Sequence, residues 1–355
     1  MARFSYLETL TAMIEDGLIP VFFNEDLETS KAVIGAVARG GARCIEWTNR
    51  GDFADELFGE LMKWARKEYP DLIMGVGSVE DAPTAISYMQ KGAEFVVGPV
   101  SRKEVAVACN RRNIPYSPGC ATPTEVLEAE EAGALLVKVF PGQVLTPKFV
   151  KANLGPRKRC QIMPTGGVSA TAESIYTWIS AGVASMGIGS DLISKKILAE
   201  KDWDGLTAKV AQCLHWVKVS RNKLKAEKGE LFVGVHHAGV VTEDIDASVA
   251  ALSSVGFTLR QKTSTAFVTL GSGCQLEIGG PDRVKEHGHL AIEVTDLEKA
   301  MEVLSAQGIT FDGEPRVSSK KDVKAVYLAG EPWGLKTRVH LYCLYSEEVD
   351  QAAGA

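Results

Sequence analysis

The sequence predicts an α/β chain of two domains: a (β/α)8 barrel over residues 1–228, followed by a smaller α+β domain of two βαβββ modules over residues 229–355. Three observations predict this. Apolar runs alternate with amphipathic stretches up to about residue 190, the pattern changes near residue 229, and an internal repeat follows. Protein domains commonly have about 150 residues, so a chain of 355 residues is also expected to form two domains.

Eight short apolar runs in the first domain end in Gly, Pro or a polar residue, and longer amphipathic stretches separate them. The runs are 18–23, 44–48, 72–77, 95–99, 115–119, 135–141, 161–167 and 184–189. The stretches with apolar residues at three-to-four spacing include 26–39, 53–68, 79–91, 102–112 and 123–132. Continuous apolar runs are typical of strands buried on both faces. Eight such units favour a TIM barrel over the competing doubly wound open sheet, and in a barrel the chemistry lies at the carboxyl ends of the strands.

Composition and charge exclude several classes of protein. The chain has 39 Lys plus Arg against 45 Asp plus Glu, a net charge of −6, which argues against nucleic-acid binding. We expect no membrane association and a cytoplasmic location, because neither a signal peptide nor about 18 consecutive apolar residues is found. Seven scattered cysteines without a Cys-x-x-Cys pair make a disulfide framework or a zinc ribbon improbable.

The second domain contains two related segments. With His237 and His289 as origins, 52 residues apart, both segments have an Asp at +7, a Leu at +15, a Ser at +16, a Gly at +19 and a Thr at +21. So many identities at one offset indicate two copies of a supersecondary unit, each with a strand, a helix and further strands.

Lys138 is the most informative residue of the first domain, because it lies inside the apolar run 135–141. Burial can lower the pKa of a lysine by up to about 3–5 units, and a neutral lysine is a nucleophile near pH 7. Alternatively, Lys138 reaches solvent along a helix or pairs with a structural carboxylate. A barrel would gather the unusual residues at the other strand ends around it: Glu46, Thr48, Arg50, Ser78, Pro99, Thr165, Gly166, Gly167, Gly189 and Ser190.

The glycine-rich turns after the seventh and eighth strands suit an anionic group. Such turns expose backbone N–H groups near helix N-termini, and barrels often bind phosphate there. Tight turning by itself would also explain these glycines.

Five ordered motifs, at residues 45–50, 75–79, 118–125, 138–141 and 164–168, carry a specific resemblance. On these motifs, residues 7–215 resemble the class I 2-keto-3-deoxy-6-phosphogluconate / 2-keto-4-hydroxyglutarate (KDPG/KHG) aldolases. The resemblance implies a lyase that cleaves a small-molecule keto acid to pyruvate and an aldehyde. It implies no cofactor for this chemistry, which uses a covalent Schiff base, and it implies a homotrimer.

The resemblance also implies a role for each candidate residue. Lys138 would form the Schiff base, and Glu46 would act as general acid and base. Arg50 and Ser78 would hold the pyruvate carboxylate, while Phe140 and Pro99 would form apolar walls. The far end of the substrate would meet Thr165, Gly166, Gly167, Gly189 and Ser190.

The sequence departs from the family pattern where the phosphate would bind. Family members often have Arg at the end of the first strand, but this chain has Phe23 and Asn24 there. Ser78 also stands where Thr is usual. The pyruvate end is intact, so both phosphorylated and non-phosphorylated substrates remain open.

Residues 231–345 resemble the vicinal oxygen chelate superfamily, which is glyoxalase-like and built from two βαβββ modules. The resemblance implies a metal site of His237, Glu277, His289 and His340, in which His340 replaces the usual Glu. Imidazoles with a carboxylate suit a divalent metal such as Zn, Ni, Mn or Fe. Two alternatives to an accessory metal-binding domain stay open: a metal-dependent isomerase or lyase activity, and a non-catalytic metabolite-binding module.

Overall fold

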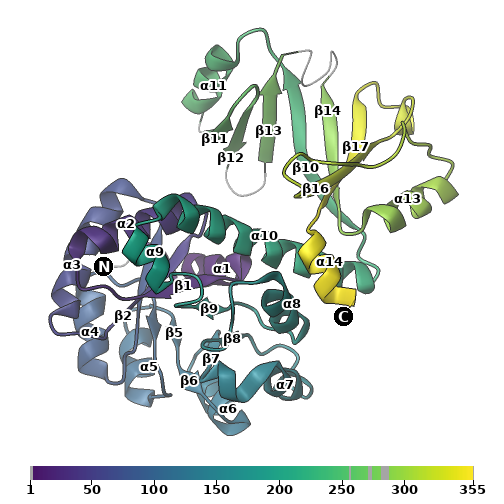
Figure 1. The fold of residues 1–355 in the computed structure, drawn as a ribbon. Helices are drawn as coiled ribbons and strands as arrows, with labels where there is room; N and C mark the ends of the chain where they lie inside the picture. The colour runs from purple at the N-terminus through teal and green to yellow at the C-terminus, as the bar shows by residue number, and fades with distance from the viewer. Residues whose placement is uncertain (1–2, 256, 271–273, 281–287, 355) are drawn as a thin grey trace. The chain divides into compact units, whose positions relative to one another are not determined.

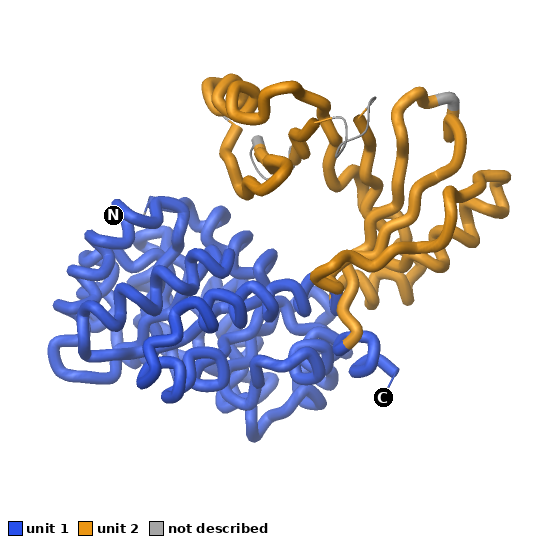
Figure 2. Tube along the Cα trace, turned by 45° about the horizontal axis from the view of Figure 1, so that its top comes forward, with its two compact units in different colours: residues 1–220, 348–355 blue, residues 221–347 orange. Residues whose placement is uncertain are grey.

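The computed structural model describes residues 3–255, 257–270, 274–280 and 288–354. The chain forms two compact units (Figure 2): unit 1 comprises Met1–Ser220 and Glu348–Ala355, and unit 2 comprises Arg221–Glu347. The sequence predicts a boundary at residues 228 and 229, just after the long helix α10 (Trp203–Glu227). The two compact units instead meet within α10, after Ser220, and the last residues of the chain belong to unit 1.

Strands and helices largely alternate along unit 1, in the order that the sequence predicts. The departure is the predicted strand at 115–119, which is divided between two short strands on either side of Pro118. The strands are β1 (Ile19–Phe22), β2 (Cys44–Thr48), β3 (Ile73–Gly77), β4 (Val96–Val97), β5 (Tyr116–Ser117), β6 (Gly119–Cys120), β7 (Val137–Val139), β8 (Ile162–Pro164) and β9 (Gly187–Ile188). The helices, besides α10, are α1 (Tyr6–Asp16), α2 (Leu27–Arg39), α3 (Ala54–Glu68), α4 (Ala82–Gln90), α5 (Lys103–Asn110), α6 (Pro123–Glu131), α7 (Gly142–Leu154), α8 (Ala172–Ser180), α9 (Lys195–Glu200) and α14 (Glu347–Gly354).

All the strand pairs of unit 1 are parallel, and the helices lie around the outside of the strands (Figure 1). One group has the order β5-β4-β3-β2-β1-β9 and the other β6-β7-β8. A parallel bridge between Thr165 and Gly187 links the two groups on one side, and Pro118 separates β5 from β6 on the other. In a doubly wound sheet the strand order reverses at an internal point, and the first and last strands do not pair. Here the first strand, β1, pairs with both the second, β2, and the last strand of the unit, β9. Unit 1 therefore has an α/β, TIM-like fold.

Local sequence signals explain where several helices begin. The side chains of Asp26, Asp81, Thr122 and Thr171 cap α2, α4, α6 and α8 by accepting a hydrogen bond from a backbone N–H in the first turn. Such a cap satisfies one of the N–H groups that have no partner within the helix. Each of these helices therefore starts shortly after the carboxyl end of a strand.

Helix α1 covers the amino-terminal end of the strands. Its Met13 packs in one buried cluster with residues at or near strand starts: Ile19, Cys44, Ile73, Phe95 and Leu136. All of these side chains are at most 3% exposed. This apolar packing fills the amino-terminal end, so an opening for a ligand must lie at the carboxyl ends of the strands.

Unit 2 is sheet-rich, and the order strand, helix, three strands occurs twice along it. The first half contains β10 (Phe232–Val241), α11 (Ile245–Ser254), β11 (Thr258–Lys262), β12 (Ala266–Leu270) and β13 (Cys274–Gly279). The second contains β14 (His289–Val294), α13 (Leu297–Ala306), β15 (Arg316–Val317), β16 (Val323–Tyr327) and β17 (Arg338–Leu344), with a short 3-10 turn, η1 (Pro332–Gly334), before β17. The sheet order is β11-β12-β13-β10-β14-β17-β16-β15, so β10 and β14, the first strands of the two halves, lie together at its centre.

No helix among the described residues has the length and the apolar composition needed to cross a membrane.

Candidate active site

The short strand β7 holds Lys138 inside unit 1. Lys138 lies between Gly119 of β6 and Met163 of β8 in the strand register. On the other side of the fold, Glu46 of β2 lies between Val21 of β1 and Gly75 of β3. Lys138 is 5% exposed and Glu46 is 1% exposed, so both ionisable groups are removed from water.

Burial shifts the pKa values of these two groups in opposite directions. Burial lowers the pKa of the Lys138 amine; the Glu46 carboxylate opposes this shift and the Arg50 cation adds to it. Burial raises the pKa of the Glu46 carboxyl, while Lys138 and Arg50 act in the opposite direction. Among the described residues, no carboxylate lies within 4.0 Å of the Lys138 Nζ, and Glu46 Oε2 accepts no hydrogen bond. Both shifts favour the uncharged forms: an amine that can act as a nucleophile and a carboxyl group that can hold a proton.

Neighbouring residues leave room for Glu46 and cover Lys138. A Cβ atom at Gly77 would lie 1.8 Å from Glu46 Oε1, so a side chain there would displace the carboxyl group. Phe140, two residues after Lys138, places its ring centroid 4.8 Å from the Lys138 Nζ. An aromatic face at this distance attracts a cation and keeps water away from the amine.

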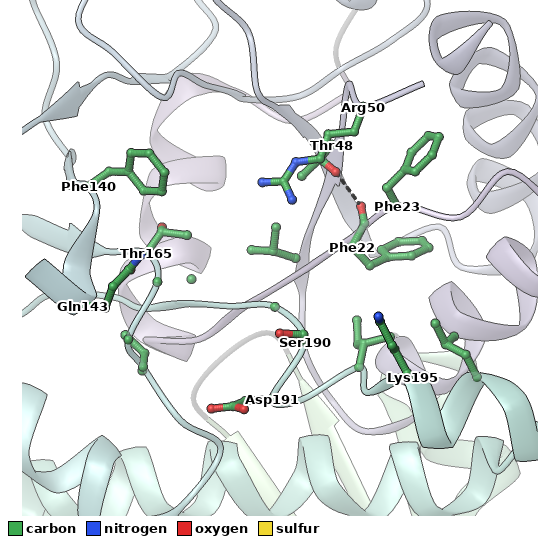
Figure 3. A pocket seen from close by; sticks show the side chains of 18 residues that line it. Phe22, Phe23, Thr48, Arg50, Phe140, Gln143, Thr165, Ser190, Asp191 and Lys195 are labelled. Carbon is green, nitrogen blue, oxygen red and sulfur yellow. Dashed lines mark hydrogen bonds between the residues drawn. The ribbon is translucent and has the colours of Figure 1, made fainter. Parts of the chain in front are cut away.

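A cavity of about 800 Å³ opens at the carboxyl ends of the strands (Figure 3). Its wall combines aromatic rings, glycine-rich backbone and a few charged side chains. The lining residues are Val21, Phe22, Phe23, Thr48, Arg50, Phe140, Gln143, Thr165, Gly166, Gly167, Val168, Gly187, Gly189, Ser190, Asp191, Ile193, Lys195 and Leu198. The hydroxyl of Thr48 donates to the Phe22 carbonyl at 3.3 Å, which ties the end of β2 to that of β1.

The structure brings most of the predicted site residues to this cavity. Seven of the eleven line it: Arg50, Phe140, Thr165, Gly166, Gly167, Gly189 and Ser190. The buried Lys138 and Glu46 are not among the lining residues. Ser78 is not part of the lining, but its Oγ accepts a hydrogen bond from Arg50 Nε at 3.2 Å. Pro99 also lies outside the lining and packs against Gly119, where its carbonyl oxygen would be 2.3 Å from a Cβ atom.

Three polar residues line the cavity without having been predicted: Gln143, Asp191 and Lys195. Gln143 belongs to α7, Asp191 follows β9, and Lys195 is the first residue of α9. The sequence signal for the last two is that they closely follow the final strand of the barrel, where loops form the mouth. Phe23, noted because the family often has Arg there, also lines the cavity.

A second polar centre lies within unit 2. His237, His289 and His340 are buried, and each has one ring nitrogen within 4.8 Å of those of the other two. Glu277 joins them: its Oε2 lies 3.4 Å from His237 Nε2 and 3.3 Å from His289 Nε2. The four residues come from β10, β13, β14 and β17, the central strands of the sheet.

The geometry of this cluster suits a metal ion. In a tetrahedral site with bonds of about 2.1 Å, neighbouring ligand atoms lie about 3.4 Å apart. The Nε2 atoms of His237 and His289 are 3.0 Å apart, and His340 Nδ1 is buried without a hydrogen-bond partner. Burial raises the pKa of Glu277, but hydrogen bonds from His237 and His289 outweigh it and lower this pKa to about 2. Burial, together with His289 and His237, lowers the pKa of His340 to about 3, so imidazole is the neutral donor that a metal requires.

Comparisons with known proteins cover both units. Residues 11–209 match the family model for KDPG and KHG aldolase. Residues 236–327 match the model of the glyoxalase/bleomycin resistance protein/dioxygenase superfamily, so the chain carries a C-terminal glyoxalase-type domain. This second match ends before β17, which contains His340.

Similar proteins also align with most of unit 1. A 2-dehydro-3-deoxy-phosphogluconate aldolase of Treponema pallidum is 31% identical over 203 residues, which are 57% of this chain and 94% of that protein. The corresponding aldolase of Haemophilus influenzae is 29% identical and aligns over 57% of this chain and 92% of its own length. A crystal structure of a Legionella pneumophila KDPG aldolase, 24% identical, aligns with a TM-score of 0.52 over 57% of this chain and 96% of that one, and supports the fold.

The family model matches more than half of the chain, over the part that contains the buried amine and the cavity. The chain therefore belongs to the KDPG and KHG aldolase family, and it is a class I, Schiff-base aldolase of the lyase class.

Proposed function

We propose that unit 1 cleaves 2-keto-3-deoxy-6-phosphogluconate or 2-keto-4-hydroxyglutarate type acids to pyruvate and an aldehyde, with Lys138 as the Schiff-base residue. The observation that carries this proposal is the buried Lys138 amine, whose pKa burial lowers and which faces the same interior as Glu46. The two similar aldolases and the family model reported above support the substrate class.

The proposed reaction begins with attack of the neutral Lys138 Nζ on the keto carbon C2. Loss of water leaves a protonated imine, which withdraws electrons from the neighbouring C3–C4 bond. Glu46, acting through water, removes the proton of the C4 hydroxyl, and the C3–C4 bond breaks. Its electron pair moves toward the imine to form an enamine, and the aldehyde leaves. Protonation at C3 and hydrolysis of the imine then release pyruvate and restore the amine.

Arg50 and Ser78 bind the C1 carboxylate in this proposal. The guanidinium of Arg50 lines the cavity, and its Nε donates to the Ser78 hydroxyl, which fixes the direction of the side chain. A planar guanidinium can donate two parallel hydrogen bonds to a carboxylate. Phe140 forms the apolar wall next to the amine, which needs a site with little water. The aldolase step needs no metal.

Borohydride reduction with pyruvate tests the assignment. The reagent should convert the imine to a stable secondary amine, and peptide mapping should find the added mass on Lys138. Pyruvate release from the keto acid should persist after treatment with a chelator. An adduct on another lysine, or no adduct in an active preparation, contradicts the role of Lys138.

Unit 2 is proposed to bind a divalent metal through His237, Glu277, His289 and His340. Three imidazole nitrogens lie within 4.8 Å of one another, and the Glu277 carboxylate lies 3.3 to 3.4 Å from two of them, which supports a transition metal such as Zn, Ni, Mn or Fe. Metal analysis of the full chain should give about one ion per chain, and chelation should lower the melting temperature. Loss of pyruvate release on chelation would instead favour a catalytic role for this domain, such as isomerase or lyase chemistry on a related keto acid.

The assembly and the division of the chain are also proposals. A homotrimer follows from the family resemblance, and light scattering of the full chain should give three times the mass of 38.2 kDa. A functional boundary near residue 228 lies at the end of α10. Limited proteolysis that cuts near this helix end would support it.

A further inference from the structure

The cavity of unit 1 has an uneven charge distribution. Of the residues that line it, Arg50, Asp191 and Lys195 carry charges at neutral pH. The proposed function assigns Arg50 to the carboxylate next to the keto carbon, together with Ser78. Lys195 and Asp191 therefore remain for the end of the substrate that leaves as the aldehyde.

The end of β1 contributes only apolar side chains to this wall. Phe22 and Phe23 both pack edge-on against Trp47, with ring centroids 5.3 Å and 5.1 Å from the indole. A Cβ atom at Gly51 would lie 2.6 Å from Phe23 Cζ, so the ring is also held from the β2 side. A wall packed in this way cannot donate a hydrogen bond to an anionic substrate group.

Lys195 can supply that positive charge from a different element. It is the first residue of α9, after Ser194, whose side chain caps the helix and fixes its start. In Figure 3 the ammonium of Lys195 is directed upward from α9, on the same side of the view as Phe22 and Phe23. No hydrogen bond or ion pair joins the Lys195 ammonium to another residue in the described part of the chain. The charge is thus available to a ligand.

The opposite side of the cavity offers neutral donors. Gly166 and Gly167 have φ angles of 81° and 69°, and a Cβ atom at either would collide with Gln143, so only glycine fits this turn. The Ser190 hydroxyl lines the same space. Backbone N–H and hydroxyl groups can bind an anion, but they supply no net charge against the cost of removing it from water.

We propose that Lys195 is a specificity-determining residue of the aldolase: its ammonium binds an anionic group, a phosphate ester or a carboxylate, at the end of the substrate remote from the keto carbon. This inference rests on the proposed function of unit 1. It means that the positive charge absent from the end of β1 enters the cavity from α9.

Three substrates that differ only at the distal end test this inference in the full-length protein: 2-keto-3-deoxy-6-phosphogluconate, 2-keto-4-hydroxyglutarate and the uncharged-end compound 2-keto-3-deoxygluconate. A hydrogen bond to a charged group is worth enough for Lys195→Met to lower kcat/KM for an anionic-end substrate by about 10- to 100-fold. The value for 2-keto-3-deoxygluconate should change by less than about twofold. Lys195→Arg should restore much of the loss.

Lys196→Met is the matched control, because Lys196 is also an exposed lysine of α9 but does not line the cavity. It should leave all three substrates unchanged. A larger effect of Lys195→Met on the phosphorylated substrate identifies a phosphate ester as the distal group, and a larger effect on 2-keto-4-hydroxyglutarate identifies a carboxylate. An equal loss on all three substrates, or no loss on any, overturns the inference.

A binding measurement separates this inference from the proposed function. Inorganic phosphate should raise the melting temperature of the wild-type protein and of Lys196→Met more than that of Lys195→Met. This result does not require turnover. Absence of pyruvate release by the wild type from all three substrates would contradict the proposed function alone, whereas equal stabilisation of all three proteins by phosphate would contradict the role of Lys195.

Discussion

Both units bury ionisable groups, but they arrange these groups in opposite ways. In unit 1, Lys138 and Glu46 are almost completely buried, and no ion pair within 4.0 Å joins them. In unit 2, His237, His289 and the Glu277 carboxylate approach one another to between 3.0 and 3.4 Å, and His340 has a ring nitrogen within 4.8 Å of those of the two histidines. A buried amine without a close partner is pushed toward its neutral, nucleophilic form. Donors that converge on one point are arranged to hold a cation.

The difference teaches that burial alone does not decide what a polar centre does. The Phe140 ring lies beside the Lys138 amine, and Glu46 acts on the pKa of this amine without an ion pair within 4.0 Å. His237, His289 and Glu277 instead place their Nε2 and Oε2 atoms within 3.0 to 3.4 Å of one another. The four predictions below test this contrast, from the largest expected effect to the smallest.

Replacing the amine should have the largest effect. Lys138→Met should abolish borohydride trapping of pyruvate and reduce turnover by about 10⁴-fold or more, because the nucleophile is lost. It should also raise the melting temperature at neutral pH. Burial lowers the pKa of Lys138 in the folded state, so protonation of the buried amine opposes folding.

The sign of this stability effect can be tested by pH. The folded protein binds the Lys138 proton less well than the unfolded chain, so stability due to this group increases as pH rises from the folded pKa toward the unfolded value of 10.5. The stabilisation by Lys138→Met should therefore shrink with rising pH. Lys148→Met, on the exposed side of α7, should leave both activity and stability unchanged. A wild-type melting temperature above that of Lys138→Met at pH 7 would contradict the account.

Removing the carboxylate should separate proton transfer from imine formation. Glu46→Gln should lower kcat by about 10²- to 10⁴-fold, while pyruvate can still be trapped on Lys138. Glu46 raises the pKa of Lys138, so its loss should extend trapping to lower pH. The measurement is the pH profile of borohydride trapping, and a shift of this profile to higher pH would exclude the proposed electrostatic coupling.

Removing one imidazole should affect unit 2 alone. His289→Ala should weaken metal binding by more than the 10- to 100-fold typical of losing an outer hydrogen-bond partner, because a ligand itself is lost. Metal content after dialysis measures this. Aldolase kcat/KM should stay within about twofold, since the cluster belongs to unit 2 and shares no residue with the proposed aldolase site. His215→Ala, in α10, is the histidine control, and equal metal loss in both variants would argue against the cluster as the site.

Removing the remaining cavity carboxylate should have the smallest effect. Asp191→Asn should raise kcat/KM for a phosphorylated substrate by about two- to fivefold, because it removes a negative charge from the cavity in which we propose that the distal phosphate binds. The effect should fade at high salt, as expected for exposed charges. Steady-state kinetics at two salt concentrations measure it. A decrease in kcat/KM would mean that Asp191 instead accepts a hydrogen bond from the substrate.

Local sequence patterns predicted helices and strands well where neighbouring residues decide the structure, as in apolar runs and helix caps. The apolar run at 44–48 became β2 with the same bounds, and Asp26 and Thr122 cap the helices whose starts they precede. Lys138 stood out because a charged residue within an apolar strand is costly. His237 and His289 stood out because the repeat places them at equivalent positions. Their pairing with Glu277 and His340 came only from the family resemblance.

The sequence did not single out Lys195, Asp191 or Gln143, because nothing in an exposed lysine near a helix start distinguishes it from its neighbour Lys196. Nor did it show that Ser78 would contact Arg50, or that the backbone carbonyl of Pro99 would lie against Gly119. These outcomes depend on how loops from separate strand ends meet at one mouth.

The sequence by itself indicated which segments are strands, which lysine is buried and which histidines are equivalent. Buried strands appear in it as apolar runs, and the duplication appears as identical residues at a fixed offset. Only the tertiary structure decided which side chains share a cavity, since residues far apart in the chain meet there through the register of parallel strands. Lys195 and the apolar side chains at the end of β1 line the same cavity only because the fold brings these separate segments together.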